Sequence, residues 1–322
     1  MQNAAAPKQD STPKTAPKRM SLVGVVQGRV QKPIRALVWG VEGIGKSTFG
    51  SNAPSPIFLG AEDGTTELDV ARFPEPTNWQ HVFDAIAELT TAEHSYRTLV
   101  LDTLDWLEPL NWEHVCAKGD GRGKRIASIE DFGYGKGYAA ALDEWRRVLA
   151  AIERLRNTRN MHVVLLAHGW IKPFKNPDGP DYDRHELKLH PKAGGLLKEW
   201  CDAVLFANYE TLTHENNGRH KGISTGARVL HTQRRAAFDA KNRYDLPETL
   251  PLDWEAFAEA VAAHRPADPN QLKARISTLL ELADAETRTK VTAALAKVGD
   301  DAAQLARIAD KLAATVNIKE NS

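Results

Sequence analysis

Residues 40–47, Gly-Val-Glu-Gly-Ile-Gly-Lys-Ser, have the types and spacing needed to bind a phosphate chain. Glycines let the backbone curl so that successive N–H groups point at one anion, and a helix beginning near Lys46 adds its positive end. The Lys46 ammonium would reach the β- and γ-phosphates, and the Ser47 hydroxyl would ligate Mg²⁺. The residues expected to hold the nucleotide are Gly40, Gly43, Ile44, Gly45, Lys46, Ser47 and Thr48. The alternative is a glycine-rich turn without this role.

Two apolar runs end in acids that could serve the same site. Residues 56–60 lead to Glu62 and Asp63, and residues 97–101 lead to Asp102. In open α/β sheets, ligands bind at the carboxyl ends of the strands. Asp102 is expected to hold Mg²⁺ through water. Glu62 and Asp63 are expected to lie where the ligand binds, and an acid pair that only caps the turn is the alternative.

Short apolar runs alternate with helical patterns along the chain, which is typical of an α/β protein. The expected strands cover residues 36–39, 56–60, 97–102, 161–168, 203–209 and 228–232. The expected helices begin at residue 46 and cover 78–91, 104–117, 138–156, 194–200 and 254–264. These elements would form one core, for which we predict the bounds 21–265.

The two ends of the chain differ from this core in composition. Residues 1–20 are rich in Ala, Pro, Lys and Thr, which predicts a disordered, mildly basic tail. Residues 266–322 are rich in Ala and Leu, with helical spacing over 272–282, 285–298 and 300–316. We expect a small helical appendage there, which could dock another subunit or a protein partner.

Composition excludes several classes of protein. The 322 residues carry a formal net charge of zero, so any nucleic-acid surface must be a local patch. No apolar run approaches the roughly 20 residues of a membrane helix, and the N-terminal residues lack the apolar core of a secretory signal. Cys116 and Cys201 have no C-x-x-C spacing, which suggests the reducing cytoplasm, and no zinc site is expected.

Two polar inserts interrupt the pattern of strands and helices. Residues 118–137 are rich in Gly and basic residues around Phe132 and Tyr134, which predicts a mobile loop. Residues 169–191 contain a turn signal at 176–179 and an alternating run at 185–190, which predicts a β-hairpin. Each could contact single-stranded DNA through cations and stacking rings, or be a surface loop or a lid over the nucleotide.

The order of these features resembles the core of RecA- and RadA-type recombinases. More closely, it resembles phage-encoded minimal RecA-like proteins, which are grouped with AAA-type ATPases and in part with single-strand annealing proteins. The resemblance covers about residues 33–258. It rests on five segments in sequence, namely residues 40–47, 58–62, 99–103, 164–168 and 193–204.

This resemblance implies a RecA-like P-loop NTPase core, with a mostly parallel central sheet flanked by helices. It also implies DNA-stimulated, Mg²⁺-dependent hydrolysis of ATP in which Glu62, Lys46 and His168 are catalytic. Glu62 would orient or deprotonate the attacking water, with Asp63 as the alternative base, and His168 would be a γ-phosphate sensor. Lys241 and Arg243 are implied to reach the nucleotide of a neighbouring subunit in a ring or filament. Alternatively, His168 is a histidine at the end of a strand whose hydrogen bonds are purely structural. Residues 241–243 are alternatively a basic turn exposed to solvent.

Three departures limit what the resemblance implies. His168 stands where RecA proteins have Gln, and its charge can change near neutral pH. The two inserts are not strongly basic, since three Asp residues at 178, 181 and 183 offset Lys172 and Lys175. A recognisable oligomerisation arm is also missing. ATP hydrolysis therefore follows from the resemblance much better than strand exchange does.

Three functions from different classes remain open at this stage. The first is a RecA-like ATPase that acts on single-stranded DNA in recombination, annealing or repair. The second is an ATPase switch or loader that regulates a protein partner through the C-terminal helices. The third is a small-molecule kinase on a P-loop scaffold, which would need a compact lid that carries arginines.

Overall fold

The computed structural model of the chain describes residues 22, 25, 31–60, 64–121, 123, 126–216, 219–264 and 269–320. Its centre is a ten-stranded sheet in the order β10-β8-β7-β1-β5-β4-β2-β3, with β6 paired to β5 and β9 paired to β7. The strands are β1 (Arg35–Gly40), β2 (Pro56–Leu59), β3 (Ala71–Arg72), β4 (Thr98–Leu101), β5 (His162–Phe174), β6 (Tyr182–Leu187), β7 (Ala203–Asn216), β8 (Arg219–His231), β9 (Lys241–Asn242) and β10 (Thr249–Pro251).

The six strands from β7 to β3 in this order are all parallel to their neighbours. The pairs that involve β6, β8, β9 or β10 are antiparallel. This arrangement confirms the expected α/β fold with a mostly parallel central sheet. β5 lies between β1, which leads into the phosphate loop, and β4, which leads to Asp102.

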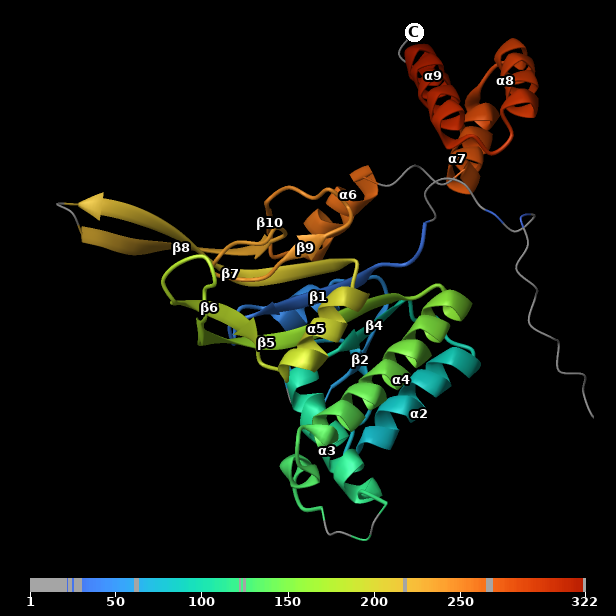
Figure 1. Cartoon of the computed structure of the whole chain (residues 1–322). Helices are drawn as coiled ribbons and strands as arrows, with labels where there is room; N and C mark the ends of the chain where they lie inside the picture. The colour runs from blue at the N-terminus through green and yellow to red at the C-terminus, as the bar shows by residue number, and fades with distance from the viewer. Residues whose placement is uncertain are drawn as a thin grey trace, which may run out of the picture. The chain divides into compact units, whose positions relative to one another are not determined.

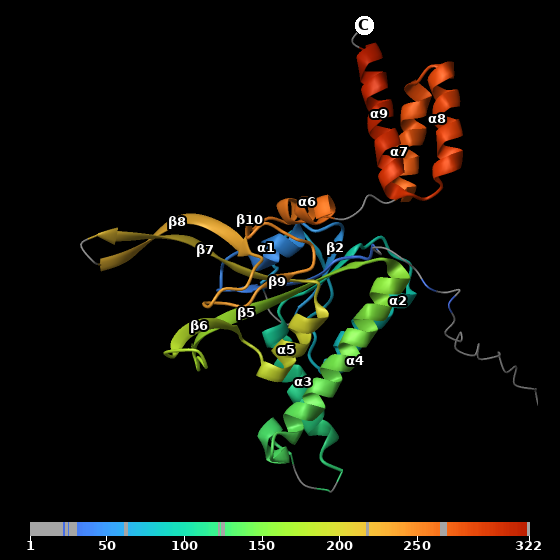
Figure 2. The same cartoon turned by 45° about the horizontal axis from the view of Figure 1, so that its top comes forward.

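Helices cover both faces of the sheet (Figures 1 and 2). One face packs on α2, α3, α4 and α5, and the other packs on α1 and α6. The bounds are α1 (Lys46–Ser51), α2 (Trp79–Thr91), α3 (Leu104–Lys118), α4 (Lys136–Arg159), α5 (Pro191–Trp200) and α6 (Trp254–His264), and a short 3₁₀ helix, η2 (Ile129–Phe132), precedes α4. Because both faces are covered, the central strands have continuous apolar runs, which is why the sequence located them.

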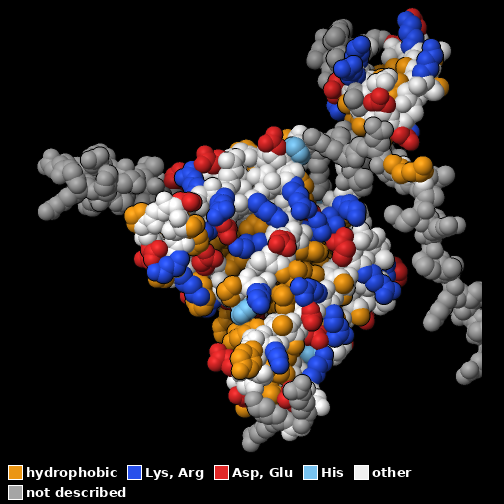
Figure 3. Space-filling model, viewed as in Figure 1, with side chains coloured by type: hydrophobic (Ala, Val, Ile, Leu, Met, Phe, Trp, Pro, Cys, Tyr) orange, Lys and Arg blue, Asp and Glu red, His pale blue; other side chains and the backbone are white. Residues whose placement is uncertain are grey.

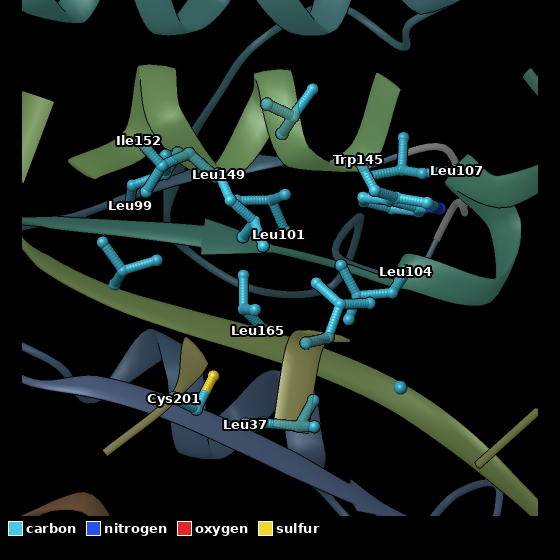
Figure 4. Close-up of a cluster of buried hydrophobic side chains, with 14 of the residues drawn as sticks. Leu37, Leu99, Leu101, Leu104, Leu107, Trp145, Leu149, Ile152, Leu165 and Cys201 are labelled. Atoms are coloured by element: carbon cyan, nitrogen blue, oxygen red, sulfur yellow. The ribbon is translucent and has the colours of Figure 1, made fainter. Parts of the chain in front are cut away.

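Alternate residues of each central strand enter different cores. In Figure 4, Leu99 and Leu101 of β4 and Leu165 of β5 face Leu149 and Ile152 of α4. The residues between them, such as Val100 and Val164, pack with Phe49 of α1 and Phe257 of α6 on the opposite face. This two-sided burial holds β1, β4 and β5 rigidly, and the candidate site is built where these strands end.

Two hairpins extend beyond the parallel part of the sheet (Figures 1 and 2). The β5–β6 hairpin pairs Gly169 with Leu187 and confirms the hairpin predicted for the second insert. β7 and β8 continue to the pair Asn216 and Arg219, far beyond the predicted strand limits of 209 and 228. The sequence analysis stopped there because residues 210–227 contain few apolar side chains. Helix α5 also begins earlier than predicted, with Pro191 in its first turn, where proline is well tolerated.

The last three helices are described by themselves. They are α7 (Pro269–Leu282), α8 (Ala285–Val298) and α9 (Ala302–Glu320), and they match the three helical patterns of the sequence. A separate apolar core joins α7 and α9 through Leu272, Ile276, Leu305 and Leu312. Residues 1–20, for which a disordered tail is expected, lie outside the described residues. In the described part of the chain, none of the helices has the length and apolar character to cross a membrane.

Candidate nucleotide site

The glycine-rich loop lies between the end of β1 and the start of α1. Gly43 has φ +70° and Gly45 has φ +105°, backbone conformations that side chains disfavour, so glycine is needed at both positions. Lys46 begins α1, is 5% exposed, and donates a hydrogen bond from Nζ to the carbonyl oxygen of Val41 at 2.9 Å. The lysine side chain thus folds back over its own loop. The sequence motif requires this position of a lysine that binds the phosphates held by the loop.

Other parts of the motif surround this turn. Ile44 is fully buried in the core against α1, which anchors the loop. Ser47 is half-buried in the first turn of α1, and Thr48 beside it is exposed. The loop residues expected to hold the nucleotide are therefore adjacent, with a hydroxyl near the loop and an apolar anchor beneath it.

Asp102 lies directly after β4 and is 3% exposed. Its backbone N–H donates to the carbonyl oxygen of Leu59 at 3.1 Å, and a Cβ on Gly60 would lie 2.3 Å from the Asp102 carbonyl oxygen. The ends of β2 and β4 are therefore in close contact. Glu62 and Asp63, the two candidate bases, lie outside the described residues, two and three positions after Gly60.

His168 lies on β5 opposite Gly40 of β1 and is 7% exposed. Its backbone N–H donates to Asp105 Oδ1 at 2.9 Å, and its Nδ1 lies 2.9 Å from Asp105 Oδ2. Burial alone would raise the pKa of Asp105, but the hydrogen bonds from His168 outweigh it and hold that pKa below its usual range. Asp105, in the first turn of α3, was not identified from the sequence, because it is far from His168 along the chain.

Glu108 is a second acid on α3 that the sequence analysis missed. It is 5% exposed, and its carboxylate accepts the backbone N–H of His190 at 2.9 Å. Burial raises the pKa of Glu108 to about 7, and the nearby charge of Asp105 acts in the same direction. The His190 ring stacks on Tyr138 with ring centroids 4.3 Å apart. Glu108 therefore fixes the end of the second insert, where α5 begins.

Arg228 is a cation at the phosphate loop that the sequence analysis did not assign. It lies on β8 with an exposed side chain, and its Nη1 is 3.4 Å from the carbonyl oxygen of Ile44. A Cβ on Gly45 would lie 2.8 Å from the same nitrogen. The glycine at position 45 thus makes room for a guanidinium that lies against the outside of the loop.

Lys241 and Arg243 are not brought to the phosphate loop of their own chain. On β7, Val204 pairs with Lys241, whereas Ala207, three residues further along, pairs with Gly40. Three strand residues span roughly 10 Å, and the basic pair lies toward the amino end of the parallel strands. The two side chains therefore lie near the amino ends of the parallel strands, whereas the nucleotide site is at their carboxyl ends.

Arg243 is part of a charged cluster around Asp202. The Asp202 carboxylate accepts hydrogen bonds from Arg35 at 2.6 and 3.0 Å and from Arg243 at 3.0 Å. Burial would raise the pKa of Asp202, but its hydrogen bond to Arg35 and the surrounding cations hold it below the usual range. Burial and the charge of Arg243 lower the pKa of Lys241. Arg243 itself remains 57% exposed and so is accessible to a ligand.

The β5–β6 hairpin carries exposed rings and cations. Trp170 is 40% exposed and Ile171 is 64% exposed, and Lys172 Nζ lies 3.8 Å from the centroid of the Trp170 ring. The end of the hairpin lies near the phosphate loop, where Lys188 Nζ is 3.7 Å from Glu42 Oε1. In the first insert Tyr134 is fully exposed, while Arg122, Lys124 and Arg125 lie outside the described residues. On the face seen in Figure 3, basic side chains alternate with acidic ones.

The donor groups at the strand ends fit a magnesium ion. Mg²⁺ prefers oxygen ligands and is usually bound in proteins by one or two carboxylates, with phosphates and water completing its shell. Asp102 and Ser47 supply one carboxylate and one hydroxyl at the carboxyl edge of β1 and β4. Within the described ranges no group of three or more His, Cys, Asp or Glu side chains could hold a metal. An ion held by Asp102 and Ser47 would need water or phosphate oxygens to complete its shell.

No curated protein matches this chain. Among solved structures, it is similar to the crystal structure of the RadB recombinase, with a TM-score of 0.39 and 12% sequence identity over 70% of this chain and 90% of that chain. A family model described as "AAA domain" (AAA_24) matches residues 32–244, which include β1, the phosphate loop, Asp102, His168 and Arg243. Since this match covers well over half of the sequence, the chain belongs to this AAA domain family.

Proposed function

We propose that the protein is a RecA-like ATPase that hydrolyses ATP with Mg²⁺ and acts on single-stranded DNA in recombination, annealing or repair. The observation that carries the ATPase part is the loop from Gly40 to Ser47, with two glycines at positive φ and a buried Lys46 folded over it. Asp102 directly follows β4, and His168 of β5 pairs with Gly40, so both lie near the carboxyl end of β1.

Each residue has a defined task in this proposal. The loop N–H groups and Lys46 bind the β- and γ-phosphates. Ser47 and Asp102 would hold Mg²⁺, which neutralises charge on the phosphate oxygens when bound. Glu62 orients or deprotonates the attacking water, with Asp63 as the alternative base. His168 contacts the γ-phosphate and so distinguishes ATP from ADP.

The experiment that tests the base is a comparison of two isosteric variants. Glu62→Gln is expected to bind ATP·Mg²⁺ as the natural protein does while turnover falls by two or more orders of magnitude, in line with the loss of a general base. Asp63→Asn is the matched control and is expected to keep most of its turnover. The opposite result would move the role to Asp63, and full activity of both variants would contradict a carboxylate base in this segment.

Binding of single-stranded DNA is supported by the β5–β6 hairpin, which starts directly after His168 and exposes Trp170 and Lys172. Aromatic faces stack on bases at about 1–3 kcal/mol each, and cations track the phosphates. A labelled oligonucleotide titrated by anisotropy should bind less tightly as salt rises. Trp170→Ala should weaken binding, whereas Trp170→Phe, which keeps a stacking face, should not. No binding at low salt, with or without ATP, would contradict this part.

A homo-oligomer, a ring or a filament, with shared nucleotide sites is also part of the proposal. It is supported by the position of Lys241 and Arg243 at the edge of the sheet away from their own phosphate loop. A cation there can serve catalysis only at the site of another subunit, as an arginine finger does. Light scattering with and without a slowly hydrolysed ATP analogue would detect such an assembly.

A second candidate function is an ATPase switch or loader that regulates a protein partner without contacting DNA. The observation that favours it is the separate apolar core of α7–α9, which gives these helices packing of their own. ATPase activity that responds to a partner but not to single-stranded DNA would support this alternative. Stimulation by single-stranded DNA alone would favour the first function.

A further inference from the structure

Asp105 contacts His168 in two ways at once. One carboxylate oxygen accepts the backbone N–H of His168 at 2.9 Å, and the other lies 2.9 Å from the ring Nδ1. Both side chains are shielded from solvent, with 3% of the Asp105 side chain and 9% of the His168 side chain exposed. A two-point contact between buried groups fixes both the position of the strand end and the rotation of the ring.

The charge of Asp105 decides which ring nitrogen is protonated. An ionised carboxylate only accepts hydrogen bonds, so Nδ1 must carry the hydrogen in this contact. The depressed pKa of Asp105 is consistent with the ionised form. In a neutral ring Nε2 is then only an acceptor. Throughout the described ranges, Nε2 makes no hydrogen bond. A ligand that accepts hydrogen bonds can therefore bind this nitrogen only if the ring takes up a second proton.

The expected ligand is such an acceptor, because a γ-phosphate offers only oxygen atoms and negative charge. His168 lies opposite Gly40, the first residue of the phosphate loop, and on the strand between β1 and β4. A glutamine at this position could donate from its amide at any pH, whereas a histidine held by an aspartate donates from Nε2 only as imidazolium.

We propose that Asp105 is a positioning residue that makes His168 a proton-coupled sensor: at a pH where the ring of the free protein is neutral, binding of a nucleoside triphosphate is accompanied by uptake of one proton from solvent at Nε2. The resulting chain runs from the Asp105 carboxylate through the imidazolium to the terminal phosphate. It stabilises the charged ring from both sides. This inference rests on the proposed function, since it needs a triphosphate in the site.

Other charged groups also lie on the elements around His168. They are Glu108 on α3, Asp102 after β4, Glu42 and Lys46 in the loop, and Glu186 and Lys188 at the end of the hairpin. Lys46 opposes protonation of the ring and the acids favour it, and all of them remain in the variants compared below. A difference between those variants therefore reports on His168 and Asp105.

The sensor position is also linked to the hairpin. The carbonyl oxygen of His168 accepts the backbone N–H of Lys188 at 2.9 Å, and the next residue, Gly169, pairs with Leu187. A Cβ on Gly169 would lie 3.2 Å from the Trp39 ring, so the glycine lets β5 pack closely on Trp39 of β1. A phosphate that contacts the His168 ring would thus contact a residue whose carbonyl oxygen is itself hydrogen-bonded to Lys188, directly after the last residue of the hairpin.

Isothermal titration calorimetry tests the proposal. A slowly hydrolysed ATP analogue with Mg²⁺, and ADP with Mg²⁺ as comparison, would be titrated in buffers of different ionisation enthalpy to count protons. At a pH alkaline enough for the free ring to be neutral, the natural protein should take up close to one more proton with the triphosphate than His168→Gln does, and no more than His168→Gln with ADP. Asp105→Asn should lose most of that extra uptake, and its thermal unfolding would establish that it is folded.

The pH dependence gives a second readout. One extra bound proton makes affinity for the analogue fall by up to tenfold per pH unit on the alkaline side, relative to His168→Gln. Equal proton uptake and equal pH profiles for the natural protein and His168→Gln would overturn this inference while leaving the ATPase proposal intact. Absence of any nucleotide binding would overturn both, and the two failures are therefore distinguishable.

Discussion

A Cβ atom on Gly40 would lie 2.0 Å from the carbonyl oxygen of Ala207. The first residue of the phosphate loop is thus packed directly against the backbone of β7, its parallel neighbour. No side chain can be accommodated there without moving one of the two strands. The loop is therefore held by contact between two backbones as well as by its own turn.

Gly40→Ala should consequently destabilise the fold. Overpacking in a rigid core costs about 1–3 kcal/mol, and here the opposing group is backbone, which cannot rotate away. Gly195→Ala is the matched control, because its Cβ would meet nothing within 4 Å and helix α5 favours alanine. Chemical denaturation measures both. Equal stability of the two variants would contradict the close contact of β1 with β7.

Arg228→Ala should weaken nucleotide binding with little effect on stability. The guanidinium lies against the loop at Ile44 and Gly45, so its charge acts on any phosphate bound there. Loss of a charge-assisted contact costs about 1.5–3 kcal/mol, roughly tenfold or more in Kd. Calorimetry with ATP·Mg²⁺ measures it, and Arg146→Ala, an exposed arginine on α4, is the control. An unchanged Kd for Arg228→Ala would exclude a role in binding.

Glu108 should make stability depend on pH. Its pKa is about 7 in the folded protein and near 4.5 in the unfolded chain, so the folded state holds the proton more tightly. Stability from this group is present below the unfolded pKa and is lost as pH rises from about 4.5 to about 7. Replacing it with Gln should therefore stabilise the protein at about pH 8, by up to roughly 3 kcal/mol, and change little at about pH 5.

Denaturation of Glu108→Gln at both pH values checks this expectation. Glu93→Gln serves as the control, because its side chain is 94% exposed. If the free energy of unfolding depends on pH equally in the natural protein and in Glu108→Gln, ionisation of Glu108 does not destabilise the folded state and this prediction is wrong.

Arg243 should act on the nucleotide of another subunit. Arg243→Ala and Lys46→Ala are each expected to lose ATPase activity alone. In a mixture, some sites combine the intact Lys46 of one subunit with the intact Arg243 of its neighbour, so part of the activity should return. Phosphate release measured across mixing ratios tests this expectation. Exchange of subunits without any recovery would argue that the basic pair has only a structural role at Asp202.

The parts of the site that the sequence predicted are local along the chain. Gly40 to Ser47 form one continuous turn, and Asp102 and His168 end apolar runs that are recognisable because both faces of the sheet are covered. The mostly parallel central sheet was implied by the resemblance and is confirmed by the structure, whereas the order of the strands is known only from the structure. The roles of Glu62 and His168 remain predictions.

The missed parts arise from contacts between residues far apart in sequence. Asp105 and His168 are 63 positions apart, and Arg228 and Ile44 are 184 apart, so no local pattern joins them. The outer halves of β7 and β8 were missed for another reason. Backbone pairing holds them, and their polar composition carries no alternating apolar signal.

The most direct test of the account is binding and hydrolysis of ATP by the purified chain with Mg²⁺, beside Lys46→Ala. The account predicts saturable binding of ATP·Mg²⁺ and steady phosphate release by the natural protein, with both strongly reduced in Lys46→Ala. A folded natural protein that binds no ATP·Mg²⁺, or that binds and hydrolyses it equally well after Lys46→Ala, would contradict the nucleotide site on which every other assignment depends.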